Sequence, residues 1–207
     1  MRMTISHPLL ARRPAYTAPA LGFIPDEPEM ALVQGRVHEA SGPARRSFAM
    51  WLAAQTEGPV LWIAPALGQE KLNSDGVCAW INPARLIFVS PKRTEDLLWT
   101  MEEVLRSGAV ALSIADLPAL PSLTQVRRMH LAAETGSKSA TGSSSGLLLT
   151  PGQGGAAGVE TRWHLSPRHA GARECWRLER RRARAAPPKD WTVCKDTNAH
   201  KLSIKRS

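Results

Sequence analysis

The chain has 207 residues, of which 43% are hydrophobic and 22% are charged, a composition typical of one folded globular domain with appendages. No apolar run approaches the roughly 20 residues of a membrane-spanning helix, and the N-terminal region lacks the apolar core of a secretory signal. These features exclude an integral membrane protein and predict a cytoplasmic location without membrane partners.

The formal net charge of +9 lies entirely at the C-terminal end of the chain. Residues 1–161 contain 14 basic and 14 acidic side chains, whereas residues 162–207 contain 13 basic and four acidic side chains. Concentrated positive charge favours an anionic partner, with nucleic acid first and an acidic protein face second. A solvated basic tail without a partner is the alternative.

The three cysteines, Cys78, Cys175 and Cys194, are odd in number and form no CxxC pair. This spacing predicts a chain in a reducing compartment, without a disulfide framework and without a zinc ribbon.

Residues 1–30 are rich in Pro and Arg and lack periodicity, which predicts an irregular N-terminal segment. The next stretch predicts a short strand at 36–39, a turn at 41–43 and a helix at 44–55, whose apolar residues recur at helical spacing. The continuous apolar run at 60–64 predicts a strand buried on both faces of a parallel sheet.

A second strand–helix unit follows. A strand is predicted at 85–89, and a helix begins near Thr94 and ends at Gly108. Another buried strand at 109–115 closes on Asp116, and a further helix is predicted at 125–134. Strands that alternate with helices of this length predict an α/β fold with a mostly parallel sheet flanked by helices. Trp99 and Leu131, within these helices, are expected in the core.

Two segments, 136–146 and 151–158, are rich in Gly and Ser or Ala, which predicts flexible loops. The pattern then changes from continuous apolar runs to alternation. Two alternating strands, at 161–166 and 175–181, predict a C-terminal antiparallel hairpin with aromatic residues inside and basic residues outside.

A connector at 183–188, a last strand at 191–194 and a basic tail at 195–207 complete the prediction.

The motif GRVHEASGP at 35–43, and a helix ending in Arg106-Ser-Gly-Ala-Val before the strand that carries Asp116, resemble the core of RecA recombinases. The resemblance implies a RecA-like domain at 31–194. A phosphate loop, however, needs GxxxxGK[ST], whose lysine reaches the phosphates and whose hydroxyl helps to hold Mg²⁺. The loop at 41–47 lacks the second glycine and the lysine, and the segment 64–67 lacks the carboxylate that acts as base in the family. We therefore expect no enzyme activity, no cofactor and no metal.

A RecA-like core with a degenerate loop and a basic C-terminal part resembles the ImuA family of the bacterial mutagenesis cassette. Local traits that carry this resemblance are Val37-His38-Glu39 and the segments 60–63, 96–99 and 161–163. The resemblance implies a non-catalytic role in the SOS response to DNA damage, in error-prone translesion synthesis. It implies as partners an ImuB-like Y-family polymerase homologue and an error-prone replicative-type DNA polymerase, with RecA and DNA as further candidates.

Two sets of candidate site residues follow. The degenerate nucleotide-loop positions are Gly42, Pro43, Arg45, Arg46, Ser47 and Asp116. The candidate nucleic-acid or partner contacts are Arg162, Arg177, Arg180, Arg181, Arg182 and Arg184.

Other interpretations remain open. The adjacent His38 and Glu39 are either a catalytic pair or, as we expect, a strand-end histidine with a local hydrogen bond beside an acid. For the whole chain, the alternatives are an inhibitor of RecA filaments or cell division by RecA mimicry, and a divergent RecA-type ATPase.

Overall fold

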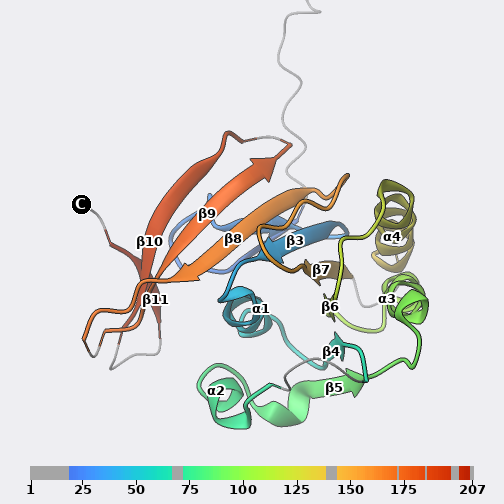
Figure 1. Ribbon diagram of the computed structural model, residues 1–207, viewed down its shortest axis with the longest axis horizontal. Coiled ribbons are helices and arrows are strands. Elements are labelled where there is room, and N and C mark those ends of the chain that lie inside the picture. The colour runs from blue at the N-terminus through green and yellow to red at the C-terminus, as the bar shows by residue number, and fades with distance from the viewer. Residues whose placement is uncertain are drawn as a thin grey trace, which may run out of the picture.

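A computed structural model of the chain describes residues 19–66, 72–138, 144–171, 173–184, 186–196 and 201–205. Its centre is a nine-stranded sheet with the order β11-β10-β9-β8-β3-β7-β6-β4-β5 (Figure 1). The strands are β3 (Val37–Ser41), β4 (Val60–Ile63), β5 (Leu86–Val89), β6 (Leu112–Asp116), β7 (Ser145–Leu149), β8 (Thr161–Pro167), β9 (Cys175–Ala183), β10 (Lys189–Lys195) and β11 (Leu202–Ile204).

Neighbouring strands from β5 to β8 are parallel, whereas β8, β9, β10 and β11 pair antiparallel. We call these two parts the parallel half and the antiparallel extension, with β8 as the strand they share. The predicted α/β fold with a mostly parallel sheet and a C-terminal antiparallel hairpin is thus confirmed.

Helices cover both faces of the parallel half. Helix α1 (Arg45–Ala53) packs on one face, and α3 (Thr94–Ser107) and α4 (Leu123–Gly136) pack on the other (Figure 1). Two short helices, α2 (Ser74–Cys78) and the 3-10 helix η2 (Pro83–Arg85), precede β5. Gly108 ends α3 in the left-handed conformation, with φ 64°, as predicted.

The two faces have different cores. On the α1 side, rings of Phe23, Phe48, Trp51 and Trp163 pack together, with the Phe23 centroid 5.1 Å from that of Phe48 and 5.3 Å from that of Trp163. On the side of α3 and α4 the buried residues are aliphatic or Met, such as Leu97 and Met101. Strand β6 lies between these two cores and is buried along its whole length, as predicted for the largely apolar stretch at 109–115.

The irregular segment predicted at 1–30 is wrong in its last third. Strand β1 (Ala20–Gly22) pairs antiparallel with β2 (Ala31–Val33), so the predicted boundary at residue 31 falls inside a hairpin. Phe23 and Met30 are fully buried, because the hairpin closes the aromatic core. Residues 1–18 lie outside the described residues.

The basic tail predicted at 195–207 also contains structure. Strand β11 pairs with β10, and its Leu202 is buried against the aromatic core. Within the tail, residues 197–200 and 206–207 lie outside the described residues.

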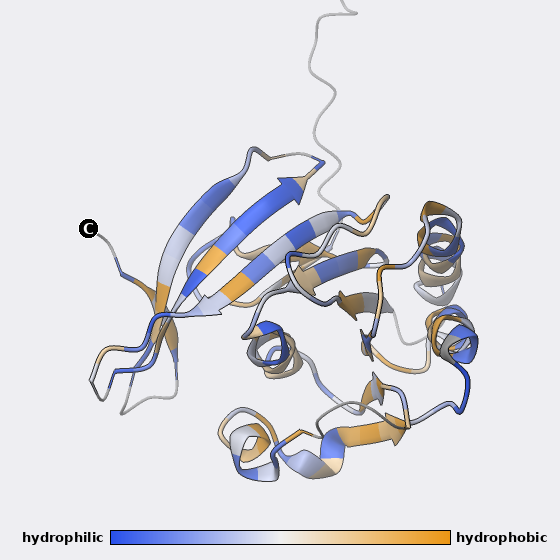
Figure 2. Ribbon diagram, in the orientation of Figure 1, coloured by the Kyte–Doolittle hydropathy of each residue, from blue (hydrophilic) through white to orange (hydrophobic). Residues whose placement is uncertain are grey.

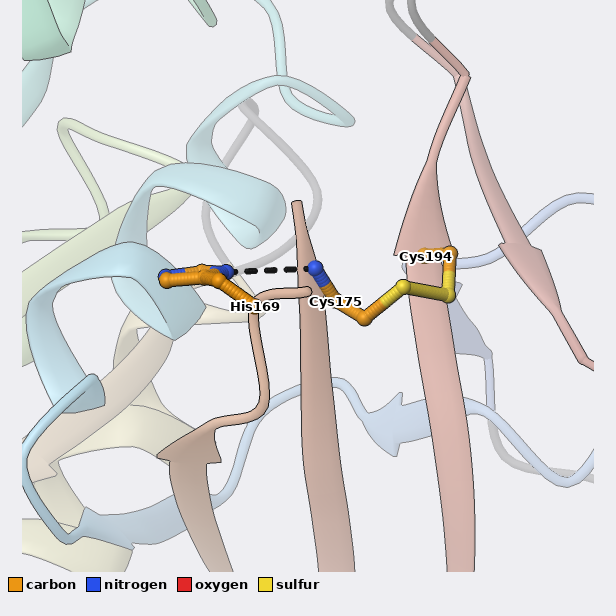
Figure 3. The surroundings of a disulfide bond; sticks show 3 residues. All are labelled: His169, Cys175 and Cys194. Atoms are coloured by element: carbon orange, nitrogen blue, oxygen red, sulfur yellow. Dashed lines mark hydrogen bonds between the residues drawn. A yellow bond between two sulfur atoms is a disulfide. The ribbon is translucent and has the colours of Figure 1, made fainter. Parts of the chain in front are cut away.

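Cys175 and Cys194 form a disulfide, which contradicts the prediction that no such bond would form (Figure 3). The two residues lie 19 apart in sequence but directly opposite each other in the register of β9 and β10. Spacing alone did not reveal this neighbourhood, because it depends on where the chain turns between the strands. The His169 ring accepts a hydrogen bond at Nδ1 from the Cys175 backbone N–H, at 3.2 Å. Cys78 is free and exposed.

Two expected core residues lie on the surface instead. The exposed fraction is 59% for Trp99 and 65% for Leu131. Both belong to amphipathic helices, and both lie outside the buried stripe of their helix. Helical spacing identified the buried stripe but did not fix its width.

Candidate functional site

The loop between β3 and α1 is closed by contacts with neighbouring strands. Gly42 has φ +93°, and a Cβ atom there would lie 2.5 Å from the carbonyl oxygen of Leu165 on β8. A side chain at this position would therefore clash with backbone as well as strain its own. The sequence keeps the glycine that the turn needs.

The backbone N–H groups of this loop are used within the protein. The Gly42 N–H donates to the carbonyl of Gly152 (3.2 Å), and the Ala44 N–H donates to that of Leu165 (3.1 Å). The Arg45 N–H donates to the carbonyl of Gly42 (3.2 Å), and Pro43 has no N–H. A phosphate loop presents such groups to its ligand. In this protein the N–H groups between Gly42 and Arg45 already donate to carbonyl oxygens of the chain.

Asp116, at the end of β6, is fully buried and bound by two arginines of the first turn of α1. The Nε of Arg46 lies 2.8 Å from Asp116 Oδ2, and Nη2 of Arg45 lies 3.5 Å from Oδ1. The structure thus brings together three of the predicted positions, Arg45, Arg46 and Asp116, in two ion pairs that share the aspartate. No cluster of three or more His, Cys, Asp or Glu residues suited to a metal ion occurs in the described part of the chain.

A second buried carboxylate, Glu39 in the middle of β3, holds the loop that follows β7. Glu39 Oε1 accepts hydrogen bonds from the Thr150 hydroxyl (2.7 Å) and from the backbone N–H groups of Gly155 (2.8 Å) and Ala156 (3.0 Å). The segment predicted as a flexible loop at 151–158 is therefore fixed to the sheet. In the other predicted flexible loop, α4 continues to Gly136 and β7 starts at Ser145, and residues 139–143 lie outside the described residues.

Arg162 completes the Glu39 site, which corrects its prediction as an outward contact for nucleic acid or a partner. Its Nε donates to Glu39 Oε2 at 2.6 Å, and its Nη2 donates to the carbonyl of Ala156 at 2.8 Å. Strand β8 pairs with β3 with Arg162 opposite Glu39, so this arginine reaches the buried acid directly. The alternation of β8 correctly placed Arg162 on the face opposite to Trp163, but it did not show that the 151–158 loop covers Arg162 on that face.

His38 and Glu39 do not form a catalytic pair, because successive strand residues point to opposite faces of the sheet. His38 is buried, and its ring contacts Thr161 Oγ1 through Nδ1 (2.7 Å) and the carbonyl of Val33 through Nε2 (2.8 Å). The Val33 carbonyl can only accept, so Nε2 carries the proton and Nδ1 accepts from the Thr161 hydroxyl. Burial lowers the pKa of His38 to about 4, and this histidine is neutral.

Arg180 is buried, which corrects its prediction as an exposed strand-end contact. Its guanidinium lies 5.2 Å from the centroid of the Trp191 ring and 5.9 Å from that of Trp163. It also donates to the carbonyl of Pro187, at 3.1 Å from Nη2. The cause is the strand period, since residue 180 continues the inward-facing series of Trp176 and Leu178.

The four remaining candidate arginines reach the surface. Arg177 pairs with Asp190 and Glu179, at 3.3 and 3.1 Å, and Arg181 pairs with Glu179 at 2.8 Å. The Nε of Arg184 lies 3.4 Å from a Glu160 carboxylate oxygen. Arg182 is exposed and, among the described residues, has no carboxylate within 4.0 Å. Figure 2 shows hydrophilic residues along most of β9, on which three of these arginines lie.

A cavity of about 610 Å³ lies where α4, the 151–158 loop and the end of β9 meet. It is lined by Arg36, Leu123, Arg127, His130, Leu131, Ala157, Gly158, Arg182 and Arg184. Charge counting did not find this site, because Arg36 and Arg127 belong to the part of the chain that has no net charge.

Comparisons with models of known protein families and with curated proteins find no match for this chain. None of the helices in the described part of the chain combines the length and the apolar character that crossing a bilayer requires.

Proposed function

We propose that the chain is a RecA-like accessory protein of the ImuA type, which acts in error-prone DNA damage tolerance without hydrolysing nucleotide. The ion pair of Arg46 and Arg45 with Asp116 carries this proposal. In a nucleotide-hydrolysing RecA core the corresponding aspartate serves the metal ion, and the loop amides serve the phosphates. Here the aspartate is held by arginines, and the N–H groups of Gly42, Ala44 and Arg45 bind carbonyl groups.

The energetics favour this assignment. A nucleotide with its metal ion would have to displace two guanidinium groups from a fully buried carboxylate before this aspartate could serve the metal. The order of elements also agrees with the resemblance. A glycine-containing turn follows a central parallel strand, and the antiparallel extension comes after the parallel half.

The resemblance implies that the protein acts through contacts with an ImuB-like polymerase homologue and an error-prone replicative-type DNA polymerase, with RecA and DNA as further partners. Its cytoplasmic location is part of the same proposal. Arg45 and Arg46 join the first turn of α1 to the end of β6 through Asp116. In this proposal the contact is structural, and it holds these two elements of the RecA-type core together without nucleotide.

The test combines a binding and a hydrolysis measurement on the same preparation. The tagged chain, co-expressed with an ImuB-like protein, is expected to co-purify with it, and labelled ATP is expected to remain intact with or without single-stranded DNA. DNA-stimulated hydrolysis that Asp116→Ala abolishes would instead establish the divergent ATPase. Failure to co-purify, with no hydrolysis, would count against the scaffold role.

A further inference from the structure

The cavity beside α4 joins positive charge to exposed apolar surface. Leu123, Arg127 and Leu131 follow one another at intervals of four residues, so they form one stripe along the outer side of α4. The exposed fraction is 40% for Leu123 and 65% for Leu131. Arg182 and Arg184 lie across the cavity, at the end of β9 and just beyond it.

The arginines of the cavity exceed their carboxylate partners. Arg36 pairs with Glu134, and Arg184 pairs with Glu160. Arg127 and Arg182 are exposed, and neither has a carboxylate within 4.0 Å among the residues that the structure describes. Four arginines against two carboxylates leave a net charge of +2, because His130 is neutral. Burial lowers its pKa, and its Nδ1 accepts from the Val37 N–H while Nε2 contacts the carbonyl of Gly158.

We propose that this cavity binds a short acidic segment of a partner protein that carries aliphatic anchors, with its carboxylates on Arg127 and Arg182 and its aliphatic side chains on Leu123 and Leu131. Arginine guanidinium groups match carboxylates with paired hydrogen bonds. The volume of about 610 Å³ fits an occupant of a few side chains.

The spacing of the stripe specifies the segment further. Residues four apart on a helix are separated by about 6 Å along its axis. In an extended peptide, alternate side chains are about 6.6 Å apart. An extended segment with the pattern aliphatic-x-acidic-x-aliphatic therefore matches Leu123, Arg127 and Leu131 in order. A second acidic residue reaches Arg182 across the cavity.

The lining residues favour a peptide over nucleic acid. Single-stranded nucleic acid is held by aromatic side chains that stack on its bases, together with positive charge. Among the described residues, those that line this cavity include no Phe, Tyr or Trp, and their apolar contacts are leucine and alanine side chains. The site does not depend on the proposed ImuA-type function, since no residue of the degenerate loop lines it.

The test is a selection from a phage library of random peptides on the intact chain. We expect enriched peptides to carry acidic residues alternating with aliphatic ones. Their fluorescein-labelled synthetic forms are expected to lose about tenfold or more in affinity for each arginine reversed in Arg127→Glu/Arg182→Glu. Both arginines are exposed, so the variant should fold, and circular dichroism checks this.

The matched control is Arg168→Glu/Arg173→Glu, which makes the same change of charge in the exposed turn at the opposite end of β9. This variant should bind the labelled peptide as the native chain does. Equal loss in both variants, enrichment of peptides without acidic residues, or no enrichment at all would overturn the proposal. Two competitors are then added to the labelled peptide: oligothymidylate, and a peptide in which Asn and Gln replace the acidic residues and Ser replaces the aliphatic ones. If oligothymidylate displaces the labelled peptide and the altered peptide does not, the cavity is assigned to nucleic acid.

Discussion

The parallel half buries the carboxylate of Glu39 and the antiparallel extension buries the guanidinium of Arg180, and the two charges are stabilised in different ways. In the parallel half, Glu39 accepts hydrogen bonds from backbone N–H groups and a hydroxyl, and it pairs with Arg162. In the antiparallel extension, Arg180 donates to carbonyl oxygens and lies against two tryptophan rings. Glu39 thus has its charge balanced by an ion pair at 2.6 Å, whereas the nearest acid to Arg180, Glu29, lies 4.0 Å away.

The difference shows how the basic C-terminal region is used. Arg162 pairs with the buried Glu39 of the parallel half, and Arg180 packs against the aromatic core, so both arginines are bound within the fold. Part of the positive charge that remains at the surface lies beside α4, where Arg182 and Arg184 of the C-terminal region meet Arg36 and Arg127. A count of charges along the sequence does not separate these uses, because it ignores which residues pair inside the fold.

The largest effect is expected from Glu39→Ala, which removes the acceptor of three protein groups and leaves Arg162 half-buried without its partner. We expect a loss of about 4 kcal/mol in the free energy of unfolding, measured by urea denaturation. The 151–158 loop should also become sensitive to protease, because its fixing hydrogen bonds end on this carboxylate. The control is Glu57→Ala, at an exposed position. A loss no larger than in this control would show that the contacts of Glu39 carry little stability.

The second effect is a pH dependence caused by His38. Its pKa is lowered to about 4 in the folded protein from 6.5, so the unfolded chain takes up the proton first as the pH falls. Stability from this group is present above pH 6.5, declines between pH 6.5 and about 4, and does not decline further below. Integrated over this range, the loss is about 3 kcal/mol.

His38→Gln isolates this contribution, because glutamine offers a donor and an acceptor without titrating. Unfolding by urea is measured at a series of pH values for both proteins. The native chain should lose about 3 kcal/mol more than the variant between neutral pH and pH 4. Parallel curves for the two proteins would mean that His38 is protonated in the folded state as easily as in water.

Much of the fold could be predicted from the sequence. The apolar runs and helical stripes gave the parallel strands and their helices, and alternation gave the hairpin of β8 and β9. In the candidate site, the loop positions and Asp116 were identified, but their ion pair was not, because it depends on the placing of α1 over the end of β6. The buried role of Arg162 and the Cys175–Cys194 bond were missed for a related reason. Each depends on strand register between distant segments, which local periodicity does not contain. The burial of Arg180 follows from the alternation of β9 itself, which the prediction did not extend to residue 180.

The smallest effect, and the sharpest test of this comparison, is the difference between two arginines of β9 that lie three residues apart. Arg180→Ala should cost about 2 kcal/mol, because it removes the contact with the Trp163 and Trp191 rings and leaves the Pro187 and Glu29 carbonyls without their donor. Arg177→Ala should cost about 0.5 kcal/mol, because its ion pairs lie at the surface. Urea unfolding of both variants gives the difference directly. Equal losses would place Arg180 on the surface with Arg177, as its prediction as an exposed strand-end contact requires.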